Sequence, residues 1–201
     1  MTEVDDAVAA IQAGQLVVLP TDTVYGLACT AEREEPARRL YRLKGREEIQ
    51  PTALVASSLD WLLESVPELR GRGETIARTL LPGPYTLVLS NPSQRFRWLS
   101  GARPDTIGVR VPDLSGAGAE VLGRVGAIVA TSANLPGGPD PCRLDEVPPE
   151  ILAGVVATVD AGELPGRAST VIDFTGPVPA VIRHGAADAV DALGRVALRL
   201  P

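Results

Sequence analysis

The sequence contains few of the residues on which common functional sites depend. It has one histidine, His184, and two cysteines, Cys29 and Cys142, which lie far apart and form no CxxC pair. A histidine-based catalytic dyad therefore has one candidate, and a zinc site of the usual ligands has almost no material. Aromatic residues make up 3% of the chain, which argues against stacking platforms for several bases.

Charge and hydropathy argue against two further classes. The net charge of −6 does not suit a protein whose main role is to grip a nucleic-acid backbone, although a local basic patch is compatible with it. No apolar run approaches the roughly eighteen residues that a membrane span needs. The acidic, periodic N-terminus MTEVDDAVAAIQAG is unlike a signal or transit peptide. We therefore expect a cytoplasmic protein.

Apolar stretches of strand length alternate with helical periodicity along the whole chain. Strands are predicted at 15–20, 52–56, 84–90, 106–112, 127–132, 154–162, 169–174 and 179–185. Helices are predicted at 2–13, 36–44, 57–66, 74–81, 118–126 and 186–200, with a polar turn at 21–26 and an irregular helical segment at 145–154. No linker or repeat interrupts the pattern, so we expect one α/β domain over 1–201 with a twisted sheet flanked by helices.

Small polar side chains stand at the ends of several predicted strands. They are Thr21, Thr23, Thr131, Ser132, Asn134, Ser169 and Thr170, with Thr106 at the start of another strand. Loops beyond strand ends line the ligand crevice of α/β sheets. Taken singly, each of these residues is better explained by turn chemistry than by ligand contact, because turns favour the same side chains.

Two basic positions also allow two interpretations. In TIGVRVP, alternation places Arg110 on the face opposite Ile107 and Val109, either to clamp a carboxylate or phosphate or to lie in solvent on an edge strand. In LKGRE, Lys44 is the only lysine of the chain and is followed closely by Arg46. An ammonium and a guanidinium together suit a polyphosphate, but cations at a helix C-terminus are common without any ligand.

Three standard signatures are absent. No GxxxxGK[ST] occurs, which argues against a P-loop, and no GxSxG occurs, which argues against the usual hydrolase elbow. The stretch GAGAEV at 116–121 has valine where a dinucleotide fingerprint needs glycine or alanine.

Seven stretches together resemble, in order, the blocks of the YrdC/TsaC family, the threonylcarbamoyl-AMP synthases. They are PTDTVYGL (20–27), LKGR (43–46), LLPGPYTLVL (80–89), TIGVRVP (106–112), ATSANLPG (130–137), ASTVID (168–173) and VIRHG (181–185). The resemblance implies a YrdC-like fold with a mixed sheet around a deep cleft. It is to the short, single-domain bacterial form, because no extra C-terminal domain follows these blocks.

The resemblance implies an activity and a set of site residues. The substrates would be L-threonine, bicarbonate and ATP with Mg²⁺, and the products threonylcarbamoyl-AMP and pyrophosphate. A downstream transferase complex would use the adenylate to modify tRNA, and this chain would itself contact tRNA at most weakly. Carried over by position, the catalytic residues would be Lys44 and Arg46, the threonine-binding residues Thr23, Arg110, Ser132 and Ser169, and the ATP-binding residues Arg46, Gln50, Thr106, Asn134, Cys142 and Arg183.

Four positions depart from the family pattern. Val55 stands where many members have histidine, Cys142 replaces a hydroxyl, Ala168 replaces a glutamate, and His184 replaces a proline. The sequence also allows a second class of function: an RNA-binding or ribosome-maturation module with the same fold and no adenylating activity. Pyrophosphate production that depends on threonine and bicarbonate would separate the two.

Overall fold

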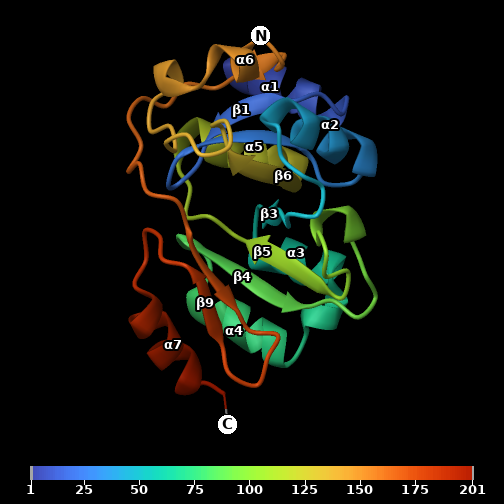
Figure 1. Ribbon diagram of the computed structural model, residues 1–201, viewed down its shortest axis with the longest axis vertical. Coiled ribbons are helices and arrows are strands. Elements are labelled where there is room, and N and C mark those ends of the chain that lie inside the picture. Colours follow the sequence, from blue (N-terminus) through green and yellow to red (C-terminus); the bar gives the residue numbers. More distant parts are fainter. Residues whose placement is uncertain (1, 201) are drawn as a thin grey trace.

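A nine-stranded mixed sheet runs through the computed structural model, which describes residues 2–200 (Figure 1). The strands are β1 (Val17–Pro20), β2 (Tyr25–Thr30), β3 (Ala53–Ala56), β4 (Tyr85–Ser90), β5 (Thr106–Arg110), β6 (Ala127–Ser132), β7 (Ala157–Thr158), β8 (Thr170–Asp173) and β9 (Ala180–Arg183). The α-helices are α1 (Glu3–Gln12), α2 (Glu34–Lys44), α3 (Leu59–Ser65), α4 (Arg72–Leu80), α5 (Gly116–Val125), α6 (Pro149–Leu152) and α7 (Ala189–Ala197). Short 3₁₀ turns are η1 (Pro67–Leu69), η2 (Arg97–Leu99) and η3 (Leu144–Glu146).

The order of the strands brings distant parts of the chain together. The order is β7-β1-β2-β6-β3-β5-β4-β8-β9. β3 pairs with β5 in parallel and with β6 antiparallel, so it joins the two halves of the sheet. In Figure 1, α1, α2 and β1 gather near the N-terminus and β4, β9, α4 and α7 near the C-terminus, with β3 between the two groups. Residues on the central strands therefore face a region reached from both halves.

Alternation along the strands divides the core into two clusters. In β1, Val17 and Leu19 pack with α1 and α5, whereas Val18 belongs to the larger cluster that includes residues of α2, α3, α4 and α7. β5 shows the expected alternation, because Ile107 and Val109 lie in the larger cluster with no exposed surface. Helices thus cover both faces of the sheet, as apolar strands with two buried faces require.

Local sequence accounts for the helix ends that matter here. Thr2 and Asp5 form a reciprocal capping box at the start of α1, in which the Thr2 hydroxyl accepts from the Asp5 amide at 3.2 Å. At the other end of the next helix, Gly45 adopts the left-handed conformation with φ of 68°. This turn leaves Lys44 as the last helical residue and starts a new direction at Arg46.

The predicted mixed α/β architecture is confirmed, with four local corrections. The sequence did not predict β2, since YGLACT has small residues and no alternation, yet all six of its residues are buried. The predicted strand at 154–162 is reduced to β7, and the predicted helix at 186–200 to α7. The interpretation of Arg110 as a solvent-exposed residue of an edge strand is wrong: β5 lies between β3 and β4, and Arg110 is buried.

Candidate active site

A cavity opens where the central strands meet the turns after β1 and before β8. Its volume is about 180 Å³, many times the roughly 10–15 Å³ that one water molecule needs. Of the sequence-predicted site residues, those that line it are Thr23, Arg46, Arg110, Ser132, Ser169 and Arg183. They come from segments that are up to 160 positions apart in the chain, and the strand order brings them to one place.

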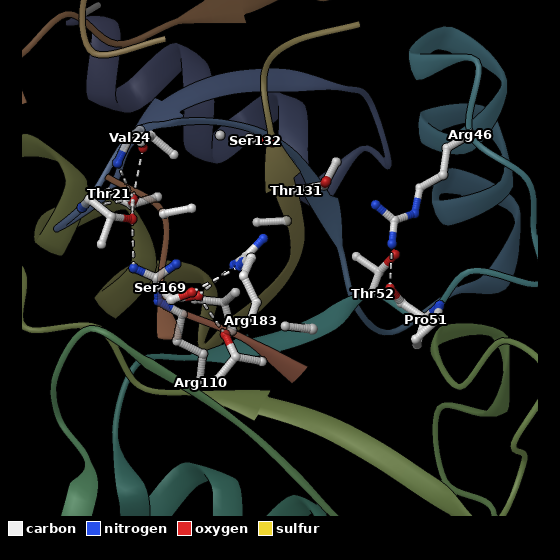
Figure 2. Close-up of a pocket in the computed structure, with 17 residues that line it drawn as sticks. Thr21, Val24, Arg46, Pro51, Thr52, Arg110, Thr131, Ser132, Ser169 and Arg183 are labelled. Atoms are coloured by element: carbon white, nitrogen blue, oxygen red, sulfur yellow. Dashed lines mark hydrogen bonds between the residues drawn. The ribbon is translucent and has the colours of Figure 1, made fainter. Parts of the chain in front are cut away.

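One side of the cavity is built around Arg110. Its Nη2 donates to the Thr23 hydroxyl at 2.9 Å and forms an ion pair with Asp22. Thr21 organises the same turn, because its hydroxyl donates to the Val24 carbonyl at 2.7 Å and lies 3.0 Å from the Thr23 hydroxyl. Figure 2 shows the labelled Thr21 and Arg110 on the same side of the cavity. A guanidinium beside hydroxyl groups suits the carboxylate of a small polar molecule.

Ser169 links this side to a second arginine. Arg183 donates through Nε to the Ser169 carbonyl at 3.0 Å and through Nη2 to the Ser169 hydroxyl at 3.1 Å. The Thr86 hydroxyl lies 2.8 Å from the same serine oxygen. Arg183 is thereby held in the wall of the cavity by neutral partners, and its positive charge remains uncompensated by a carboxylate at hydrogen-bond distance among the described residues.

Arg46 lies on the opposite side of the cavity from Thr21 in Figure 2. Its Nη2 donates to the Pro51 carbonyl at 2.5 Å. Its buried Nε, and the buried hydroxyl of Thr52 nearby in the lining, have no hydrogen-bond partner within residues 2–200. Buried polar atoms of this kind normally have a partner, so these two atoms are available to a ligand that enters the cavity.

The electrostatics of the cavity favour an anion. The charged residues that line it, in the part of the chain that the structure describes, are all arginines: Arg46, Arg110 and Arg183. Burial lowers the pKa of each guanidinium below its ordinary value, and Arg183 contributes to the lowering at the other two. Cations brought together in this way repel one another, and a bound anion would relieve that repulsion.

Lys44 lies behind the cavity wall rather than in it. Its ammonium donates to the Ser132 carbonyl at 2.5 Å, to the Asn134 carbonyl at 2.9 Å and to the Asn134 side-chain oxygen at 2.6 Å. Burial lowers its pKa to about 8, with a contribution from the positive charge of Arg46. The only lysine therefore ties the end of α2 to the turn that follows β6, and it holds the cavity residue Ser132 from behind.

Four other predicted residues lie outside the cavity lining. Gln50 is exposed in the turn before β3, and Thr106 is buried with its hydroxyl donating to the Arg103 carbonyl at 2.9 Å. Asn134 contacts Lys44, and Cys142 donates its thiol to Glu146 at 3.2 Å. The structure thus brings Asn134 to the edge of the site, whereas ATP contacts of Gln50, Thr106 and Cys142 stay predictions.

Sequence reasoning missed three residues of the site: Asp22, Thr52 and Thr86. Thr52 and Thr86 line the cavity, and Asp22 pairs with Arg110 from behind. Thr52 precedes β3 and Thr86 lies in β4, so only their neighbours in the sheet reveal them. Asp22 offered one signal, an acidic residue in a polar turn between apolar stretches, in a region where the site was already expected.

The described residues limit two further possibilities. Within residues 2–200 no three His, Cys, Asp or Glu side chains lie together as a protein-held metal ion would require. No helix in that range is long and apolar enough to cross a membrane.

Fold and site together define a mixed α/β protein whose cavity is lined by three arginines. The Sua5_yciO_yrdC family model, described as telomere recombination, matches residues 9–185. The chain belongs to the Sua5/YciO/YrdC family.

Relatives and solved structures agree with this assignment. A putative threonylcarbamoyl-AMP synthase of Mycobacterium tuberculosis (strain H37Rv) is 36% identical over 89% of this chain and 82% of its own length. The threonylcarbamoyl-AMP synthase of Pyrococcus abyssi is 34% identical over 89% of this chain, which spans only 53% of that longer protein. The crystal structure of P. abyssi Sua5 complexed with L-threonine superposes with a TM-score of 0.85 at 30% identity, covering 100% of this chain and 59% of that one.

Proposed function

We propose that this protein is a threonylcarbamoyl-AMP synthase, which makes L-threonylcarbamoyl-AMP and pyrophosphate from L-threonine, bicarbonate and ATP. The observation that carries the proposal is the cavity itself, in which arginines from three separate segments line one space together with small hydroxyl side chains. Relatives named as this synthase are 34–36% identical to most of the chain, and the P. abyssi protein has a structure with L-threonine bound.

The side of the cavity around Arg110 fits the amino-acid substrate. We assign Arg110 to the threonine carboxylate, and the hydroxyls of Thr23, Ser132 and Ser169 to the polar groups of threonine. Hydroxyl groups can donate and accept, so they can follow the amino group as it becomes a carbamate. Val55 lines the same cavity, and it supplies apolar surface where many family members have histidine.

The side around Arg46 fits the phosphates of ATP. Arg46 and Arg183 have no carboxylate partner at ion-pair distance within residues 2–200, so they are available to phosphate oxygens. We place Asn134 and Lys44 behind them, where Lys44 fixes the turn at 132–134. Direct contacts of Gln50, Thr106, Cys142 and Lys44 with ATP would require these side chains to reach beyond their present positions.

Magnesium would arrive with the nucleotide. The described residues form no cluster of three potential ligands, and Mg²⁺ in nucleotide sites is commonly held by one or two carboxylates together with substrate phosphates. The ion therefore belongs to the substrate, as Mg²⁺-ATP, rather than to a preformed protein site.

In this reaction the protein positions the reactants and stabilises the negative charge on the phosphates. The threonine amine and bicarbonate give N-carboxythreonine with loss of water; its new carboxylate attacks the α-phosphorus of ATP, and pyrophosphate leaves. No step needs a protein nucleophile. Arg46 and Arg183 can hold the two anionic reactants together against their mutual repulsion. They can also stabilise the negative charge that develops on the phosphates.

The product suits a tRNA-modifying process outside this chain. We propose that a downstream transferase complex takes the adenylate and transfers its threonylcarbamoyl group to adenosine in tRNA, with at most weak tRNA contact here. The alternative, an RNA-binding module without adenylating activity, has less support. The net charge is −6, and Arg46, Arg110 and Arg183 line a small cavity.

The decisive experiment is pyrophosphate release by the purified chain with each substrate omitted in turn. We expect release only when ATP, Mg²⁺, bicarbonate and L-threonine are all present, and a product with the mass of threonylcarbamoyl-AMP. Equal pyrophosphate release without threonine would contradict the proposal, because the amino acid would then not enter the product. RNA binding without pyrophosphate release would favour the alternative.

A further inference from the structure

Asp22 forms a buried contact with the proposed carboxylate-binding arginine but does not line the cavity. The exposed fractions of the two side chains are 8% for Asp22 and 11% for Arg110. The Asp22 carboxylate uses both oxygens: one accepts from Arg110 Nη2, and the other accepts from the backbone N–H of Asp113 at 3.2 Å. Asp22 therefore connects the turn after β1 to Arg110 and to the segment that follows β5.

The hydrogen bonds of Arg110 leave part of its guanidinium unused. Within the described residues its side-chain hydrogen bonds to Asp22 and Thr23 both start from Nη2. The Nε of Arg110 is buried and has no partner there. A guanidinium presents five N–H donors in a planar fork, so a group held at one nitrogen can still receive a carboxylate at the remaining donors.

A buried arginine needs such a partner in order to keep one orientation. Its side chain has several rotatable bonds, and Gly108, two residues earlier in β5, has no side chain that could pack beside it. An unpaired buried cation is strongly unfavourable and would turn toward other acceptors. Asp22 removes that penalty and fixes one end of the fork.

We propose that Asp22 is a positioning residue for the amino-acid substrate: it holds Arg110 so that the free donors of the guanidinium receive the substrate's α-carboxylate. This inference rests on the proposed function, since it takes the cavity to bind an α-amino acid. Asp22 acts through Arg110 and touches no reacting atom. An opposite role, in which Asp22 occupies Arg110 and must be displaced, predicts that removing Asp22 tightens substrate binding.

The test is L-threonine binding by isothermal titration calorimetry on the full chain, with the Michaelis constants for threonine and ATP measured separately. Asp22→Ala should raise the threonine dissociation constant by about tenfold or more, because the guanidinium is no longer held in place. Asp22→Asn should give a smaller loss, since its amide oxygen can still accept from Arg110. The Michaelis constant for ATP should stay within about twofold in both variants, because Asp22 acts only at the amino-acid side.

Asp173→Ala is the matched control. Asp173 accepts from Arg103 at 2.6 Å, with 12% of the Asp173 side chain and 53% of the Arg103 side chain exposed, so the substitution removes an ion pair outside the cavity. It should lower the melting temperature without changing threonine binding. In an Arg110→Lys background, Asp22→Asn should add little further loss, because the two residues act as a unit.

Unchanged or tighter threonine binding by both Asp22 variants would overturn the inference, and so would equal losses for threonine and ATP. These outcomes are distinct from failure of the proposed function, in which the wild-type chain itself binds no threonine and both proposals fall. If Asp22→Ala does not fold, Asp22→Asn alone decides, because it preserves size and one acceptor.

Discussion

Of the residues in the site, Arg110 has the role that depends most on the geometry of its side chain. Its fork is held by Asp22 and Thr23 through one nitrogen, in a position that lysine cannot reproduce with a single ammonium. We expect Arg110→Lys to raise the Michaelis constant for threonine by about tenfold or more, although the charge is kept, with little change for ATP. Steady-state pyrophosphate release at varied threonine measures this. A wild-type response to threonine would remove Arg110 from the amino-acid site.

Lys44 allows a test at a single nitrogen. Its ammonium reaches two carbonyls and one side-chain oxygen of residues 132–134, and this set matches a compact donor better than a planar fork. Lys44→Ala should lower turnover more than it weakens ATP binding, and Lys44→Arg should recover only part of the loss. Turnover equal to wild type in Lys44→Arg would show that the choice of lysine is immaterial.

The pH dependence follows from the same group. Burial lowers the pKa of Lys44 to about 8 from the usual 10.5, so the amine loses a proton, and with it a donor, as pH rises above about 8. Turnover should fall on this alkaline side, and the fall should be absent in Lys44→Arg. Stability should not fall for this reason: between these two values the unfolded chain holds more protons on Lys44, so its contribution to the unfolding free energy rises with pH. Parallel pH–rate and melting measurements separate the two effects.

At the scale of single elements, α5 offers two glycines with opposite surroundings. A Cβ added at Gly118 would lie 2.8 Å from the carbonyl oxygen of Pro20, whereas one at Gly123 would meet nothing within 4 Å. Gly123→Ala should stabilise the protein by about 0.5–1 kcal/mol through helix propensity. Gly118→Ala should destabilise it by about 1–3 kcal/mol, because α5 must move off the end of β1. Urea unfolding of both variants measures the difference, and stabilisation by Gly118→Ala would mean that α5 can shift freely.

How much of the molecule the sequence predicts also varies by element. Runs containing Val, Ile and Leu, such as 106–112, predicted their strands, and alternation correctly placed Arg110 opposite Ile107. β2 was missed because its Gly, Ala and Cys have weak strand preference, and the strand forms only through its neighbours β1 and β6. The partners of Lys44 and Arg110 lie 87–90 positions away in sequence, so pairing of strands, not local pattern, determines them.

At the scale of the whole molecule, the chain cannot be split at one position into two segments that each form a separate sheet. β1, near the N-terminus, pairs with β7 beyond residue 156, and β4 pairs with β8. We therefore expect residues 1–201 to unfold as one cooperative unit. Far-UV circular dichroism and the fluorescence of Trp61 and Trp98 should give coincident melting curves. Two separated transitions would indicate that the two ends of the sheet fold independently.

The solitary lysine has a practical consequence for observing motion. An amine-reactive reagent can modify only the α-amino group and Lys44, so a mass spectrum of the undigested protein shows at most two additions, and the doubly modified species requires modification of Lys44. Lys44 is 5% exposed and its nitrogen is enclosed by residues 132–134, so its modification requires that turn to open. The rate at which Lys44 is modified therefore measures how often the turn at 132–134 opens. Ligands that close the site should lower this rate.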